Sequence, residues 1–98
     1  MTDGGMPRIL LVEDDAALAE WICDYLKLRN FDVTHTTRGD EAVALIQTLN
    51  PDVVLLDGML PGLDGLEVCK QVRPEFANGI IMITARDEEV DEVLGLEM

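Results

Sequence analysis

The sequence predicts an α/β domain built on a parallel β-sheet that is doubly wound, with helices on both faces. Short apolar runs alternate with longer helical segments along the chain, and this alternation is typical of βαβ units. The run at residues 52–56 is almost uniformly apolar, as expected for a central strand that is covered on both faces. Polar residues follow three of the four apolar runs, and open α/β sheets bind ligands at the carboxyl ends of their strands.

The first half of the chain predicts a strand, a helix, a strand and a helix, in that order. These elements are expected at residues 8–13, 16–29, 32–35 and 40–49. Asp15 is a suitable N-cap for the first helix. Apolar residues recur on one face of that helix at spacings of three and four, namely Leu18, Trp21, Ile22, Tyr25 and Leu26. We expect the two aromatic residues to pack or to be partly exposed rather than to bind a ligand.

The second half predicts two further strands, each followed by a helix. The strands are expected at residues 52–56 and 79–83, and the helices at residues 66–72 and from about residue 87 toward residue 96. Pro74 ends the first of these helices, because proline cannot continue a helix interior. Right-handed crossovers would place helices on both faces of the sheet and bring the carboxyl ends of the strands to one edge.

Composition limits the classes of function. A chain of 98 residues has room for one domain. Its 20 acidic and 7 basic residues give a net charge of -13, which opposes binding to nucleic acid and to anionic membranes. No apolar stretch has the length of a membrane span and no secretory leader is present, so we expect a cytoplasmic protein. Cys23 and Cys69 lack metal-binding or redox spacing and are expected to be reduced thiols inside helices.

Acidic residues gather at the predicted carboxyl edge of the sheet. Glu13 ends the first strand and Asp14 follows it, Asp57 follows the third strand, and Thr84 follows the fourth. Carboxylates so close together cannot all stay ionised without help, and Mg²⁺ prefers such oxygen ligands. Met59 would add its backbone carbonyl as a further ligand. Asp57 would then be a nucleophile for phosphoryl transfer, with the Thr84 hydroxyl within reach of a phosphoryl oxygen.

Simpler roles also fit some of these residues. Asp15 and Asp64 are expected to be helix N-caps or turn residues. His35 is the only histidine and has no second histidine or cysteine with which to share a metal, so we expect it to take no part in chemistry. Asp57 taken alone fits a solvated turn as well as a nucleophile. The combination of VEDD, D-x-M-x-P-G and T-A after three different strands is far more specific than any one part.

With these motifs in place, the chain resembles the receiver domain of two-component response regulators over essentially its whole length, and most closely the OmpR/PhoB class. DGMLPGLDG at residues 57–65 resembles the loop that begins with the phospho-accepting aspartate of that family. The resemblance implies a flavodoxin-like sheet with strand order 2-1-3-4(-5). It also implies a phosphoacceptor switch that assists its own Mg²⁺-dependent phosphorylation, rather than an enzyme of conventional turnover.

The resemblance assigns a role to each candidate site residue. Asp57 is the phosphoacceptor, and Asp14 and Asp57 contact Mg²⁺ directly. Glu13 acts on the ion through water, and Met59 through its backbone carbonyl. Thr84 turns toward the phosphoryl group and bonds it. The implied phosphodonor is a phosphohistidine on a sensor histidine kinase, and the implied output is an attached winged-helix domain that binds DNA.

Two departures from the family pattern bear on these roles. Gly58 stands where relatives carry a bulky apolar residue, which predicts a looser backbone beside Asp57. Relatives also continue beyond the last residues of this sequence into a fifth strand with a lysine and a fifth helix. We therefore expect residues 1–98 to be a truncated receiver without a DNA-binding domain. Lys27 and Lys70 lie in predicted helices and are poor substitutes for that lysine.

Truncation has two expected consequences. Without the lysine of the fifth strand, the chain could act as a receiver-like interaction or dimerisation module that is not phosphorylated, and this is the alternative function. We also expect self-association through the strand at residues 79–83, through the helix that follows it, or by exchange of elements, because an exposed sheet edge pairs readily with another chain.

A haloacid-dehalogenase-type phosphatase is a second alternative, because that class also places an aspartate nucleophile at a strand end with Mg²⁺. That class requires a second aspartate two residues after the nucleophile, and Met59 occupies that position. Its acidic pair also follows the nucleophile, whereas Glu13 and Asp14 precede Asp57. The sequence therefore disfavours this alternative.

Overall fold

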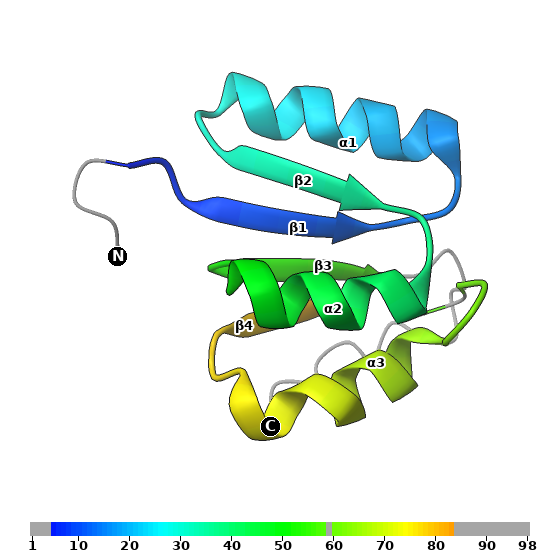
Figure 1. Cartoon of the computed structure of the whole chain (residues 1–98). Helices are drawn as coiled ribbons and strands as arrows, with labels where there is room; N and C mark the ends of the chain where they lie inside the picture. The colour runs from blue at the N-terminus through cyan, green and yellow to red at the C-terminus, as the bar shows by residue number, and fades with distance from the viewer. Residues whose placement is uncertain (1–4, 59, 84–98) are drawn as a thin grey trace.

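The computed structural model describes residues 5–58 and 60–83, which form a four-stranded parallel sheet with α-helices between the strands (Figure 1). The elements are β1 (Arg8–Val12), α1 (Ala16–Leu28), β2 (Asp32–Thr36), α2 (Gly39–Leu49), β3 (Val53–Asp57), α3 (Gly65–Val72), the 3₁₀ helix η1 (Arg73–Glu75) and β4 (Gly79–Ile83). The helix predicted from about residue 87 lies outside the described residues.

All elements predicted within the described part of the chain are confirmed, and no end differs from its prediction by more than one residue. β3 begins and ends one residue later than predicted, so Asp57 is the last residue of the strand rather than the residue after it. α3 begins at Gly65 because the side chain of Asp64 accepts a hydrogen bond from the Glu67 amide (3.0 Å). Asp15 accepts one from the Leu18 amide (3.1 Å). Both aspartates are thus the N-caps that the sequence predicts.

The strand order β2-β1-β3-β4, with every pairing parallel, confirms the predicted doubly wound sheet. The chain moves from β1 outward to β2 and then crosses back over β1 to reach β3. Because parallel crossovers are right-handed, this reversal places α1 on one face of the sheet and α2 and α3 on the other. Val12 is paired with Thr36 on β2 and with Leu56 on β3, so three strands end at the same level.

The main core lies between the sheet and the α2–α3 layer. Alternate strand residues point into it, because successive side chains of a strand face opposite sides. Its buried members are Leu10, Val12, Ala42, Ile46, Val54, Leu56, Val68, Cys69, Val72, Phe76, Ile80 and Met82. The core therefore fixes three strands against two helices directly below the edge where those strands end.

The predicted apolar face of α1 is only partly buried. Ala19 is fully buried and Ile22 and Leu26 are half-buried, whereas Trp21 is 66% exposed and Tyr25 is 47% exposed. The two aromatic rings stack with their centroids 6.1 Å apart. The sequence left packing and partial exposure open for these two residues, and the structure shows that both are exposed.

The two cysteines are free, Cys69 buried and Cys23 half-buried, which agrees with the reduced thiols predicted from their spacing. Within residues 5–58 and 60–83, no helix combines the length and the apolar character needed to cross a bilayer.

Candidate functional site

Three carboxylates meet at the carboxyl edge of the sheet. Glu13 and Asp14 directly follow β1, Asp57 ends β3, and these strands are neighbours. One carboxylate oxygen from each residue lies within 4.8 Å of the other two. We call this group the acidic triad. The structure thus brings together the three acidic residues that the sequence predicts as partners.

The backbone of Glu13 is held by the end of β2. The Glu13 amide donates to the carbonyl oxygen of Thr36 (3.0 Å), and Nε2 of His35 lies 2.8 Å from the carbonyl oxygen of Glu13. Because a carbonyl oxygen only accepts, His35 Nε2 is the donor in this contact. His35 therefore has a structural role that the sequence did not reveal, and its lack of a chemical role stays a prediction.

The side chain of Glu13 is only 4% exposed, and one of its oxygens accepts a hydrogen bond from the Asp15 amide (3.1 Å). Burial raises the pKa of Glu13, and the nearby carboxylates of Asp57 and Asp14 raise it further, while the Asp15 amide opposes the shift. The triad therefore sets a buried carboxyl group, that of Glu13, beside the exposed Asp14 and the half-buried Asp57, and this arrangement disfavours the charged form of Glu13.

The donor set of the triad fits Mg²⁺. The ion takes oxygen ligands at about 2.1 Å, so two ligands on opposite sides of it are about 4.2 Å apart. Triad oxygens within 4.8 Å of one another can surround such an ion directly or through one water. Burial and then the acidic neighbours raise the pKa of Glu13, and a cation bound at the triad would offset the repulsion among the three carboxylates.

The loop after Asp57 folds back onto the end of β3. The Gly65 amide donates to the carbonyl oxygen of Gly58 (3.2 Å), and the Gly58 amide donates to that of Ile83 (3.2 Å). A Cβ at Gly65 would lie 2.7 Å from the Asp57 carbonyl oxygen, closer than side chains are found. Gly65 is thus a glycine because its backbone lies directly against Asp57.

Gly58 is under no such constraint. Its φ is not positive, and the described atom nearest to an added Cβ is Sδ of Met82 at 3.5 Å, an ordinary contact. The backbone beside Asp57 is therefore held by two hydrogen bonds, although the residue there has no side chain.

Two predicted site residues, Met59 and Thr84, lie outside the described residues, and their roles stay predictions. Sequence reasoning missed Thr36, which is buried at the end of β2 and donates from Oγ1 to Glu41 Oε1 (2.7 Å). The available signal was its place, since it is a polar residue at the carboxyl end of a strand, as are Glu13 and Asp57.

Comparison with known proteins identifies the class. The chain matches the response regulator receiver domain family over residues 9–98. It belongs to this family, whose members are signalling switches of two-component phosphorelays rather than enzymes of conventional turnover.

Individual solved structures agree with this assignment. The chain is 39% identical to the BeF3-activated N-terminal receiver domain of RstA from Klebsiella pneumoniae, with a TM-score of 0.83 over 92% of this chain and 77% of that one. For the receiver domain of Francisella response regulator 1452 the identity is 33%, with the same TM-score and coverage. The signal receiver domain of the putative response regulator NarL from Mycobacterium tuberculosis is 30% identical, with a TM-score of 0.81 over 94% of this chain and 78% of that one.

Proposed function

We propose that this receiver accepts a phosphoryl group on Asp57 from a phosphohistidine of a sensor histidine kinase. The convergence of the acidic triad at the end of β1 and β3 supports this proposal most directly. In it, Asp14 and Asp57 hold Mg²⁺ directly, Glu13 holds it through water, and Met59 contributes its backbone carbonyl.

In the transfer step, a carboxylate oxygen of Asp57 attacks the phosphorus atom. The bond from phosphorus to the donor imidazole breaks, and an acyl phosphate remains on Asp57. Bound Mg²⁺ would neutralise charge on the phosphoryl oxygens as they pass through a loose transition state. Thr84 would donate its hydroxyl to one of these oxygens, and this contact would carry the signal into the segment that follows β4.

The triad contributes position as well as charge. Glu13 is fixed by hydrogen bonds to its amide, its carbonyl and its side chain, and Asp57 by the last backbone pairing of β3 with β4. Two rigid strands therefore set the separation of the carboxylates, and reactive groups held in this way lose little entropy at the transition state.

We further propose that the receiver is cytoplasmic and controls an attached output domain, of the winged-helix, DNA-binding kind found in the OmpR/PhoB class, so that nucleic acid is not bound by the receiver itself. The 39% identity to a receiver domain that is N-terminal in its own protein supports an attached output domain, and the resemblance of residues 57–65 to the phosphoacceptor loop of the OmpR/PhoB class supports the winged-helix kind. An interaction module that is never phosphorylated is the alternative, and the triad argues against it, because three converging carboxylates are costly to keep without a cation.

Self-association through β4 belongs to the same proposal. Among the described residues, β4 pairs only with β3, and its residue Ile81 is 46% exposed. A sheet edge with exposed apolar side chains is a template for pairing with a second chain.

The proposed function is tested by intact mass after incubation with Mg²⁺ and acetyl phosphate. We expect the wild type to gain the mass of one phosphoryl group and Asp57→Asn to gain none. Asp64→Asn is the matched control, because asparagine caps helices as well as aspartate does, and it should be phosphorylated like the wild type. Phosphorylation of Asp57→Asn, or none of the wild type, would contradict the proposal.

A further inference from the structure

The junction between β2 and α2 contacts the loop that follows Asp57. We call residues 36–41 the β2–α2 junction and residues 60–64 the acceptor loop. The Gly39 amide donates to the carbonyl oxygen of Pro61 (3.1 Å). A Cβ at Gly39 would overlap the carbonyl oxygen of Leu63. The two backbones therefore touch directly, with no space for a side chain between them.

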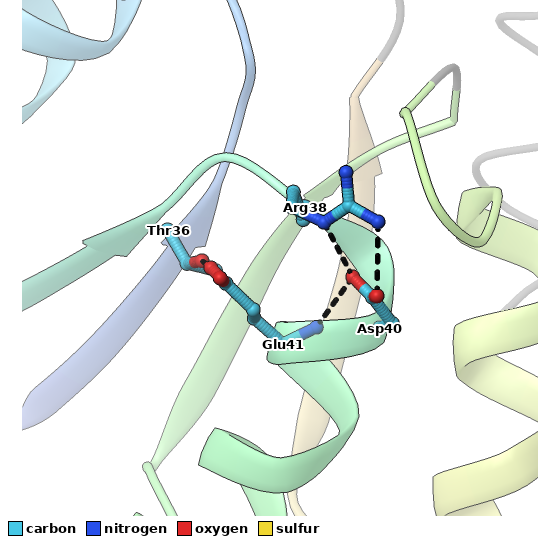
Figure 2. A network of polar contacts seen from close by, with 4 residues as sticks. All are labelled: Thr36, Arg38, Asp40 and Glu41. Carbon is cyan, nitrogen blue, oxygen red and sulfur yellow. Dashed lines mark hydrogen bonds and ion pairs between the residues drawn. The ribbon is translucent and has the colours of Figure 1, made fainter.

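An ion pair of the junction lies against the same loop. Arg38 and Asp40 form two hydrogen bonds, Nε to Oδ1 and Nη2 to Oδ2, each 3.0 Å long (Figure 2). Gly62 has a φ of +85°, and a Cβ there would lie 2.8 Å from Asp40 Oδ1 and 2.9 Å from Arg38 Nη2. The ion pair thus packs against a turn of the loop that only glycine fits.

The junction is also connected to the first member of the acidic triad. Thr36 donates from its hydroxyl to Glu41 in the first turn of α2 (2.7 Å; Figure 2), and its carbonyl oxygen accepts from the Glu13 amide (3.0 Å). Thr36 is 6% exposed. The end of β2 therefore links Glu13 to the start of α2 through two short hydrogen bonds that meet at the buried Thr36.

The acceptor loop completes the connection at the other end. It leads into Gly65, whose backbone lies against the carbonyl of Asp57 and donates to that of Gly58. Leu60 and Leu63 pack against the main core. A closed path of contacts thus runs from Glu13 through the junction and the loop to Asp57.

We propose that Gly39 and the Arg38–Asp40 pair are positioning residues for Asp57. They hold the acceptor loop against the start of α2 and so fix Asp57 relative to Glu13 on the neighbouring strand. The consequence for Mg²⁺ binding and phosphorylation rests on the proposed function. The effect on the position of Asp57 does not rest on it.

If the Arg38–Asp40 pair only stabilised the fold, its removal would change the folded fraction and leave Asp57 in place in the molecules that stay folded. Arg38 and Asp40 are about half exposed, and exposed ion pairs contribute little to stability. Removal of the pair should therefore leave the folded fraction almost unchanged, so that any effect at Asp57 reports on position.

The first test compares Gly39→Ala with Gly79→Ala. The control makes the same chemical change where an added Cβ would meet its nearest described atom, Cγ2 of Val53, at 3.8 Å. We expect Gly39→Ala to shift the backbone amide NMR signals of Asp57 and Gly65. We also expect it to weaken Mg²⁺ binding per folded molecule by about tenfold, as changes behind metal ligands do. Gly79→Ala should change neither.

Arg38→Ala is the second variant, because Gly39→Ala could also destabilise the fold. We expect Arg38→Ala to keep the thermal midpoint of the wild type but to shift the same two amide signals and to weaken Mg²⁺ binding severalfold. Arg38→Lys keeps the charge but not the paired hydrogen bonds. Its amide shifts and its Mg²⁺ affinity should lie between those of the wild type and those of Arg38→Ala.

The inference is overturned if the folded variants leave the amide signals of Asp57 and Gly65 where the wild type has them. It is also overturned if those signals shift no more than in Gly79→Ala. A wild type that binds no Mg²⁺ would instead contradict the proposed function, and the amide signals would still decide whether the junction positions Asp57.

Discussion

The surroundings of Glu13 disfavour its charged form. Its raised pKa, caused first by burial and then by Asp57 and Asp14, means that the folded protein holds this proton more tightly than the unfolded chain does. The resulting stability is fully present below the ordinary glutamate pKa of about 4.3. It is lost as the pH rises through the raised value.

Glu13→Gln should therefore unfold at a higher temperature than the wild type at pH 7 in the absence of Mg²⁺. Glutamine keeps an acceptor for the Asp15 amide and removes the buried charge. The advantage should disappear as the pH falls toward 4, where the wild-type glutamate is protonated. Circular dichroism melts in a chelator between pH 4 and pH 8 measure this difference. A variant less stable than the wild type at pH 7 would show that repulsion in the triad is not the dominant effect.

Replacement of Gly58 by alanine should increase the free energy of unfolding. Its φ is accessible to any residue, and a Cβ would make an ordinary contact with Met82. Gly58→Ala should stabilise the protein by about 0.4–1 kcal/mol, because alanine restricts the unfolded chain. Gly65→Ala is the contrasting variant, since its Cβ would lie 2.7 Å from the Asp57 carbonyl oxygen, and it should destabilise. Urea titrations of both variants test the pair, and equal effects would contradict the geometry.

At the scale of elements, α3 depends on its N-cap. Asp64 ends the acceptor loop and satisfies the Glu67 amide, which has no partner within the helix. Asp64→Ala should cost about 1 kcal/mol, whereas Asp64→Asn should cost little. Thermal unfolding of the two variants distinguishes the contribution of the capping hydrogen bond to stability from that of the negative charge. A loss in Asp64→Asn as large as in Asp64→Ala would assign the effect to the negative charge instead.

The elements were predictable from sequence where the causes are local. Apolar runs, Asp15 and Asp64 as caps, and carboxylates after strands each depend on neighbouring residues, and the fold and the acidic triad follow from them. The role of Gly39 was not predictable, because its reason is the backbone of Leu63, far along the chain. The same holds for the burial of Thr36 and for the exposure of Trp21, since both depend on which surfaces meet in the folded molecule.

At the scale of the whole molecule, the two faces of the sheet are unequally covered by the elements within residues 5–58 and 60–83. α2 and α3 bury one face, where Ile80 is 4% and Met82 6% exposed. The alternate residue Ile81 points to the opposite face, where it is 46% exposed. Within the described residues, the β4 side of the sheet thus combines an open hydrogen-bonding edge with apolar surface, and this combination favours pairing with a second copy.

Sedimentation velocity over a range of concentrations tests this association. The wild type should sediment faster as its concentration rises, and Ile81→Lys should remain monomeric, because a charged side chain on an edge strand opposes pairing. Thr34→Lys is the matched control. It places the same charge at an exposed position of β2, the strand at the other side of the sheet, and should associate like the wild type. A wild type that stays monomeric throughout, or equal effects of the two lysines, would exclude β4 as the contact. The strand proposed to associate, β4, is the neighbour of β3, which carries Asp57. Because Asp57 is paired with Ile83 of β4, a change at Asp57 on phosphorylation would reach the edge strand, and association would then depend on phosphorylation.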